Sequence, residues 1–333
     1  MRYAQAGVRA KILAMINTMQ KFALFYGEAL RRYAFPAGHP FRVERVERFW
    51  NVINQEGILN SEMVQVCEPV IASENDILAF HIPEYVNFVK KASKIGTGYL
   101  DAGDTPAFKG VYEASLYTVG TTLKALEMVM SGEASNAFNP IGGLHHAWKD
   151  RASGFCVFND AAIAITMAKT RYKLSRILYV DIDAHHGDGV FYEFYNDSEV
   201  FIADMHEDGR LLFPGTGFEN EIGSGSAAGR KMNIVLDAGS GVKEFKKGFA
   251  KVIQFAERAE PELILLQCGA DGLAGDPITH LKYTPECHKF AAEQLYILSE
   301  RFCQGKIVAM GGGGYNLDNV ARAWLEIVKG LMC

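Results

Sequence analysis

The sequence has 333 residues, with 34 Lys and Arg against 39 Asp and Glu and a formal net charge of −5. A chain of this length can bury a large core without disulfides or structural metal ions. It has no basic stripe and no apolar stretch of about 18 residues, which argues against direct nucleic-acid binding and against a membrane span. No C-x-x-C pair occurs, and the apolar runs around Cys156 and Cys268 favour buried thiols in a reducing, cytoplasmic compartment.

The amino terminus is basic and contains no acid up to residue 27. An organelle transit peptide is one interpretation of such a segment. We favour instead a short amphipathic helix or an upstream extension over residues 1–20, followed by a single domain over residues 21–333.

Short, nearly all-apolar runs predict buried parallel strands, and segments of helical periodicity separate many of them. In chain order we expect a strand at 23–26, a helix at 112–130, a strand at 137–139, a helix at 161–170, strands at 177–182, 200–203 and 232–236, a helix at 244–259, a strand at 263–267, a helix at 285–302, a strand at 307–310 and a helix at 316–329. This alternation predicts an α/β domain with a mostly parallel central sheet and helices on both faces.

Polar side chains follow five of the expected strands at their carboxyl ends, where open α/β sheets bind ligands. They are His145 and His146, Asp181 and Asp183, His206, Asp271, and Tyr315. We therefore expect chemistry at this edge of the sheet.

The densest cluster is the run from Asp181 through Asp183 and His185, which follows an apolar strand. Alternate residues of an extended segment share a face, so these three side chains are expected to point the same way. An Asp and a His two residues apart form a half-site for a divalent metal ion, although a solvated turn has a similar composition. Asp271 is the preferred third ligand. Asp276 is the other candidate, but it precedes a proline and is more typical of a turn residue.

The tandem His145-His146 follows a Gly-Gly pair and suggests a proton-transfer station, since imidazole titrates near neutrality. Asp181 and Asp188 are available to orient the two imidazoles. Tyr315, after four consecutive glycines, can donate its hydroxyl to a developing oxyanion. The glycines allow the backbone to approach another group closely.

Six blocks of the sequence carry a family resemblance: Gly-Gly-Leu-His-His-Ala at 142–147, Ser-Gly-Phe-Cys at 153–156 with Asn159-Asp160, Asp-Ile-Asp-Ala-His-His-Gly-Asp-Gly-Val at 181–190, Phe-Pro-Gly-Thr-Gly at 213–217, Gln-Cys-Gly-Ala-Asp at 267–271 and Gly-Gly-Gly-Gly-Tyr-Asn at 311–316. Through them, residues from about 23 to 330 resemble the zinc-dependent histone deacetylase family, class I-like and including bacterial acetoin-utilization proteins and archaeal homologues. The resemblance implies the arginase-like fold and a location in the prokaryotic cytosol.

It also implies metal-dependent hydrolysis of acetyl-lysine side chains in a protein or peptide partner, with release of acetate. Zinc is the implied cofactor, and Fe(II) or Co(II) would suit the same donors. The implied roles are metal ligands Asp183, His185 and Asp271, a general base and acid His146 with its partner Asp188, a neighbouring His145 paired with Asp181, and a carbonyl-polarising Tyr315.

The same resemblance assigns residues to the substrate path. Phe155 and Phe213 would wall a narrow tube for the lysine methylenes, and Gly154 would let that tube close tightly. Asp104 would grip the substrate backbone at the rim. Arg45 would lie on an internal exit path for acetate.

One position departs from the class I pattern, where a Ser precedes the segment that here begins with Met205. This chain has Asp204 instead. In the family this position helps to form a potassium site beneath the zinc, which here would involve Asp181, Asp183, His185, Asp204 and Met205. The added carboxylate puts occupancy of that site in question.

Three alternatives remain open at the sequence level. Hydrolysis of acetylpolyamines would use the same chemistry, although Gly-Gly-Leu before the tandem His resembles the protein deacetylase branch. A binuclear manganese ureohydrolase would share the fold but needs more acidic bridging ligands. A catalytically silent protein that binds acetyl-lysine would retain the site without turnover.

Overall fold

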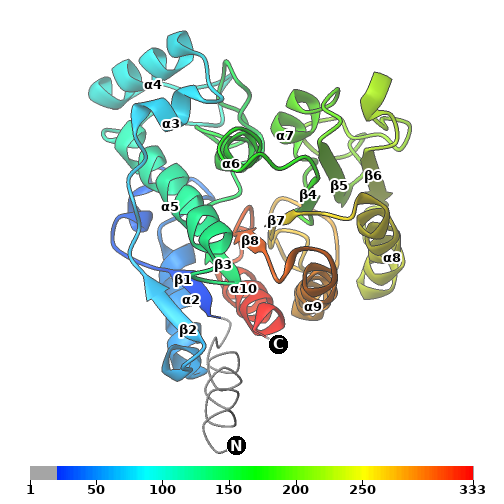
Figure 1. The fold of residues 1–333 in the computed structure, drawn as a ribbon. Helices are drawn as coiled ribbons and strands as arrows, with labels where there is room; N and C mark the ends of the chain where they lie inside the picture. Colours follow the sequence, from blue (N-terminus) through cyan, green and yellow to red (C-terminus); the bar gives the residue numbers. More distant parts are fainter. Residues whose placement is uncertain (1–20, 333) are drawn as a thin grey trace, which may run out of the picture.

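The computed structural model describes residues 21–332, which form one eight-stranded sheet flanked by helices (Figure 1). All neighbouring strands of this sheet are parallel, in the order β2-β1-β3-β8-β7-β4-β5-β6. In sequence order the strands are β1 (Phe22–Phe25), β2 (Val64–Cys67), β3 (Asn136–Asn139), β4 (Ile177–Asp181), β5 (Val200–Glu207), β6 (Lys231–Leu236), β7 (Leu263–Gln267) and β8 (Ile307–Met310). The predicted α/β class and its parallel sheet are confirmed.

The helices of residues 21–332 surround the sheet, and those over 112–130, 161–170, 244–259, 285–302 and 316–329 lie within two or three residues of their predicted bounds. They are α2 (Glu44–Gln55), α3 (Glu74–Leu78), α4 (Pro83–Ile95), α5 (Val111–Ser131), α6 (Asp160–Thr170), α7 (Asp188–Glu193), α8 (Val242–Ala259), α9 (Pro285–Cys303) and α10 (Leu317–Leu331). Asn316 caps α10 because its side chain accepts the amide protons of Asp318 and Asn319. The helix that the sequence placed from 316 therefore begins one residue later.

Each buried strand contributes alternate side chains to two separate cores. In β4, Tyr179 packs on the face covered by α5, α6 and α7, whereas Leu178 and Val180 pack on the face covered by α8, α9 and α10. Figure 1 shows these helices on opposite sides of the sheet. Because both faces are covered, the strands are apolar throughout instead of alternating with polar residues, which explains why apolar runs predicted them.

Several elements were missed or misplaced by the sequence prediction. β2 is an edge strand whose Val-Gln-Val-Cys sequence is half-exposed, so it lacks a continuous apolar run. β5 extends to Glu207, four residues beyond its predicted end. His206 therefore lies inside the strand and not after it. The proposed extension at residues 1–20 lies outside the described residues.

The sheet order brings together strands that are distant in sequence. β3, β8, β7 and β4 are consecutive neighbours, so the segments that follow their carboxyl ends meet at one edge. These segments contain the tandem histidines, the glycine segment (residues 311–314), Asp271 and the run from Asp181 to His185. No helix within residues 21–332 is long and apolar enough to cross a membrane.

Candidate metal centre and catalytic residues

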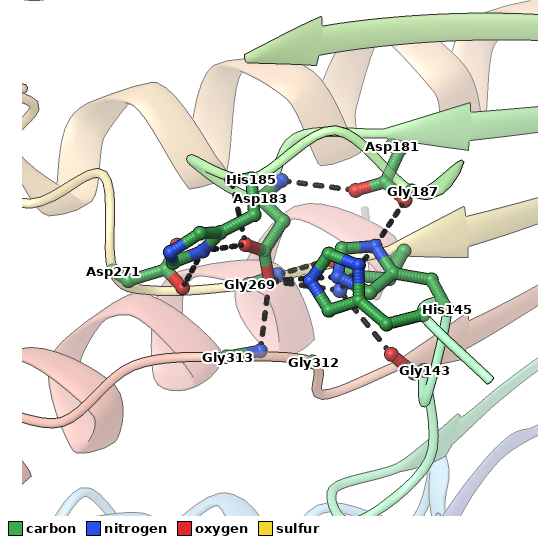
Figure 2. Close-up of polar contacts among 12 residues, drawn as sticks. Gly143, His145, Asp181, Asp183, His185, Gly187, Gly269, Asp271, Gly312 and Gly313 are labelled. Atoms are coloured by element: carbon green, nitrogen blue, oxygen red, sulfur yellow. Dashed lines mark hydrogen bonds and ion pairs between the residues drawn. The ribbon is translucent and has the colours of Figure 1, made fainter. Parts of the chain in front are cut away.

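Asp183, His185 and Asp271 form a compact group beyond the ends of β4 and β7 (Figure 2). The Nδ1 atom of His185 lies 3.0 Å from Asp183 Oδ1 and 3.1 Å from Asp271 Oδ2. Within residues 21–332, this is the one group of at least three His, Cys, Asp or Glu side chains arranged to hold a metal ion. One imidazole nitrogen and two carboxylates, without a thiolate, suit a catalytic divalent ion that keeps an open position.

The backbone and one amide side chain fix the orientation of both carboxylates. Asp183 Oδ2 accepts hydrogen bonds from Gln267 Nε2 and from the Gly313 amide, both at 2.9 Å. Asp271 Oδ1 accepts one from the Ala184 amide at 2.8 Å. Such outer contacts fix the carboxylates that would hold the ion. Gln267, at the end of β7, was not identified from the sequence because its role depends on this three-dimensional contact.

The electrostatics of the group also fit a bound cation. Burial raises the pKa of Asp271, and the nearby Asp183 carboxylate raises it further. Burial lowers the pKa of His185, but the two carboxylates outweigh it and raise this pKa to about 10. The pair of buried carboxylates thus favours positive charge between them, and a divalent ion would supply more of it than a proton does.

Replacing Gly313 by Ala is expected to weaken zinc binding by at least about tenfold, which corresponds to about 1.4 kcal/mol. A Cβ atom at this position would lie 2.1 Å from Asp271 Oδ2 and 2.8 Å from Asp183 Oδ2, so the ligands would have to move. Competition titration with a chromophoric chelator measures the affinity. Gly241→Ala is the control, because its Cβ would meet nothing closer than 3.4 Å. Equal zinc affinity in the two variants would contradict the prediction.

The two tandem histidines each contact one carboxylate, as the sequence predicted. His145 Nδ1 lies 2.8 Å from Asp181 Oδ2, and His146 Nδ1 lies 2.7 Å from Asp188 Oδ1. The two rings are adjacent, with centroids 4.0 Å apart. Asp181, the last residue of β4, faces His145 (Figure 2), and the Nε2 atom of the same imidazole lies 4.0 Å from Asp183 Oδ2. The expectation that Asp181 shares one face with the metal ligands stays a prediction.

Burial and neighbouring charges shift the pKa values of the two imidazoles in opposite directions. Burial lowers the pKa of His145, but the Asp181 and Asp183 carboxylates raise it to about 9. For His146, burial and the positive charge of His145 outweigh Asp188 and lower the pKa to about 4. At neutral pH, His146 is therefore the neutral imidazole, with Nε2 free to accept a proton, and His145 is the charged one.

Two further residues hold the segment that carries the tandem histidines. Asp160 accepts the amide protons of Gly143 and Leu144, at 2.8 to 3.0 Å. Asn159 Nδ2 donates to the His145 carbonyl at 3.3 Å and to the Ala147 carbonyl at 2.8 Å. The sequence showed Asn159-Asp160 as part of a matching block without a role, and the structure shows both side chains as supports of the histidine segment.

Tyr315 lines the same inner cavity as His146, Asp183 and His185. Its amide donates to Asp276 Oδ2 at 2.8 Å, and the other Asp276 oxygen accepts the Ile278 amide proton. Asp276 is thus a turn residue that supports Tyr315, as the sequence suggested. Burial raises the pKa of Tyr315 well above its usual range, so the phenol stays protonated and can act as a hydrogen-bond donor.

Two aromatic side chains pack against residues that line this cavity. The Phe155 ring meets the Tyr315 ring edge to face at 5.7 Å, and the Phe213 ring lies 5.0 Å from the His146 ring. A Cβ atom on Gly154 would lie 2.6 Å from His146 and 2.8 Å from Phe213. Only glycine leaves room there, which fits the predicted narrowing of a slot between the rings.

Asp104 and Arg45 lie in different surroundings. Asp104 shares an outer cavity with Gly154, Phe213 and Arg151, and burial and Asp101 raise its pKa to about 7. Its role at the rim stays a prediction.

Arg45 is fully buried and donates from Nη2 to the carbonyls of the glycine segment. Its Nε and Nη1 have no hydrogen-bond partner within residues 21–332. A small anion would satisfy them, and the acetate path stays a prediction.

Asp204 is paired within the protein. Its Oδ1 lies 2.6 Å from His206 Nδ1, and its Oδ2 accepts the Gly187 amide proton at 2.9 Å. His206 Nε2 donates to the Gly217 carbonyl at 2.8 Å. Burial lowers the pKa of His206, but Asp204 raises it above its usual value. Both oxygens of Asp204 therefore already have partners within the protein, and the expected potassium site stays a prediction.

Comparison with known proteins points to one family. The family model described as histone deacetylase domain matches residues 39–331. The acetoin utilization protein AcuC of Bacillus subtilis (strain 168) is 38% identical over 326 residues, which cover 94% of this chain and 83% of the relative. The AcuC protein of Staphylococcus aureus (strain MRSA252) is 33% identical, covering 96% and 83%. A solved structure described as the HDA15 HD domain superposes with a TM-score of 0.86 at 25% identity, covering 95% of this chain and 89% of that one.

Proposed function

The chain belongs to the histone deacetylase family, a family of metal-dependent deacetylases, and on that premise we propose that it hydrolyses the acetyl amide of lysine side chains in proteins or peptides. The products would be acetate and the free lysine. Both named relatives are bacterial, which supports the proposal of a prokaryotic cytosolic enzyme.

One observation carries this proposal. Asp183, His185, His146 and Tyr315 line a single inner cavity. Asp271 completes the group of candidate metal ligands, and Asp188 contacts His146. The Phe213 and Phe155 rings pack against His146 and Tyr315. With a divalent ion held by the three ligands, this arrangement would bring a Lewis acid, a base and an oxyanion donor together. The slot between two aromatic rings suits an extended alkyl chain, because it excludes water without offering charged partners.

Zinc, held by Asp183, His185 and Asp271, would polarise the amide carbonyl and make a water molecule more acidic. His146 Nε2 takes the proton of the attacking water and later returns it to the departing amine. Asp188 keeps the proton of His146 on Nδ1 and is itself fixed by Trp148 Nε1 at 3.1 Å. Tyr315 donates its hydroxyl to the carbonyl oxygen as negative charge develops there. We expect no covalent enzyme intermediate.

The alternatives differ in what they require of the site. An acetylpolyamine would enter the same slot, and the Gly-Gly-Leu sequence before His145 is the feature that favours a protein substrate. A binuclear ureohydrolase needs bridging carboxylates, whereas residues 21–332 provide one group of three ligands. A silent acetyl-lysine reader has no need of a neutral base beside an oriented carboxylate, which the His146–Asp188 pair provides.

The test is acetate release from an acetyl-lysine peptide and from acetylputrescine, with zinc-loaded and chelated protein. We expect zinc-dependent release, lost by at least about 100-fold on chelation and restored by added zinc, with the peptide as the better substrate. Faster turnover of acetylputrescine than of the peptide would identify acetylpolyamines as the substrate class. Binding of the peptide without release under zinc, iron or cobalt would instead establish the silent reader.

A further inference from the structure

Phe155, in the wall of the slot, has a left-handed backbone conformation that aromatic residues rarely adopt. Ser153 and Cys156 exchange backbone hydrogen bonds of 3.2 and 2.8 Å and enclose a two-residue turn. Both turn residues have positive φ, at 53° for Gly154 and 67° for Phe155. Such a turn favours Gly or Asn, and a bulky aromatic residue in this region is strained. Contacts from elsewhere must therefore hold Phe155 in place.

Two side chains from other segments bind the backbone of Phe155. Its amide donates to Thr105 Oγ1 at 3.0 Å, and its carbonyl accepts the Tyr33 hydroxyl proton at 2.8 Å. Thr105 is fully buried and Tyr33 is 1% exposed. The Tyr33 oxygen in turn accepts the Val157 amide proton at 3.0 Å. Neither polar group of the Phe155 backbone is left without a partner, so the strained turn is fixed from both sides.

Thr105 is itself oriented by a carboxylate. Its hydroxyl faces Asp101 Oδ2 and lies 3.1 Å from Asp104 Oδ1, so its proton points to an acid and its lone pair is free for Phe155. Asp101 Oδ1 also accepts the amide protons of Gly103, Asp104 and Thr105, at 2.9 to 3.1 Å. The Asp101 carboxylate thus holds the backbone of the loop over residues 101–105. This loop contains the rim residue Asp104, and through Thr105 it contacts Phe155 in the slot wall.

The position of the Phe155 backbone fixes where its ring lies in the slot wall. Its ring packs edge to face between Tyr315, at 5.7 Å, and His39, at 4.5 Å. The His39 ring has Nε2 3.1 Å from the Asp104 carbonyl, so the same loop supports both the backbone of Phe155 and one side of its ring. A change in the turn would therefore widen or shift the slot. The hydrogen bonds of the Thr105 hydroxyl itself go to Phe155, Asp101 and Asp104 and not to the metal ligands or the tandem histidines.

We propose that Thr105, oriented by Asp101, is a positioning residue that holds Phe155 in its left-handed conformation and so sets the affinity of the slot for the acyl-lysine side chain. The inference rests on the proposed function for the identity of the ligand. Thr105 does not touch the reacting atoms, so replacing it is expected to change substrate binding and not the chemical step.

The experiment compares Thr105→Val with Thr105→Ser in the zinc-loaded protein. Valine keeps the shape but removes the acceptor, which leaves the part-buried Phe155 amide without its partner. We expect KM for the acetyl-lysine peptide to rise roughly tenfold with kcat changed less than about threefold, and serine to restore the wild-type KM. Thr118→Val is the matched control, because it removes another buried hydroxyl whose bond to the Ala114 carbonyl lies within α5.

Tyr33→Phe provides a second, independent variant, since it removes the other contact to the Phe155 backbone. It is expected to raise KM in the same way. An unchanged KM in folded Thr105→Val and Tyr33→Phe would overturn the inference, as would a loss of kcat in Thr105→Val that serine does not restore. Failure of the proposed function is recognised separately, because wild-type protein would then release no acetate. In that case, peptide dissociation constants measured by calorimetry for the same variants still decide the role of Thr105.

Discussion

Replacing Tyr315 by Phe is expected to lower kcat for acetyl-lysine hydrolysis by about 100- to 1000-fold, the usual effect of removing one oxyanion donor. The ring contact with Phe155 is retained, so peptide binding should change little. The high pKa of the buried phenol means that the wild-type hydroxyl is a donor throughout the neutral range. Acetate release under single-turnover conditions, together with KM, measures the effect.

Tyr283→Phe is a matched control for this experiment. Tyr283 is equally a buried tyrosine, 1% exposed, and its hydroxyl has no hydrogen-bond partner within residues 21–332. Its hydroxyl can be removed without loss of a contact, so kcat should stay within about twofold of wild type. A Tyr315→Phe variant that keeps wild-type kcat would remove the phenol from the mechanism.

Replacing His146 by Gln is expected to lower kcat/KM by about 100- to 10,000-fold, because glutamine cannot accept a proton. The wild-type rate should also show a characteristic dependence on pH. The pKa of His146 is about 4, so the base form is present above that pH and is lost as the pH falls through it. Activity of zinc-saturated protein should therefore decline near pH 4, and this acid limb should be absent from the residual activity of His146→Gln.

Two comparisons separate this effect from general damage to the site. Asp188→Asn should reduce kcat, because the imidazole loses the carboxylate that orients its Nδ1–H. His280→Gln should have little effect, since the His280 side chain is 60% exposed and contacts Glu207 away from the cavity. An acid limb that persists unchanged in His146→Gln would assign it to another group.

The sequence predicted the parts of the site that follow directly from strand ends. Asp183, His185 and Asp271 come after apolar runs, and the parallel topology alone brings them to one edge. The number of available acids predicted that Asp181 and Asp188 could orient the tandem histidines, and the family resemblance assigned each acid to its histidine. Both contacts are present. Family resemblance supplied the slot residues, for which periodicity gave no signal.

The supporting contacts could not be predicted from local patterns. Gln267 and Asp160 are ordinary polar residues at the end of a strand and the start of a helix, and their partners lie 84 and 17 residues away in sequence. His206 looked catalytic because the apolar run before it ended early, whereas β5 continues through it. β2 gave no signal because an edge strand needs no buried second face.

The position of β8 has a consequence for the order of assembly. This last strand lies between β3 and β7, so without it the groups β2-β1-β3 and β7-β4-β5-β6 have no shared hydrogen-bonded neighbour. The tandem histidines follow β3, whereas the metal ligands follow β4 and β7, which places them in different groups. During synthesis, the two half-sites therefore join only after the final strand has emerged. A nascent chain without it would have two additional open sheet edges, at β3 and β7, and no complete cavity.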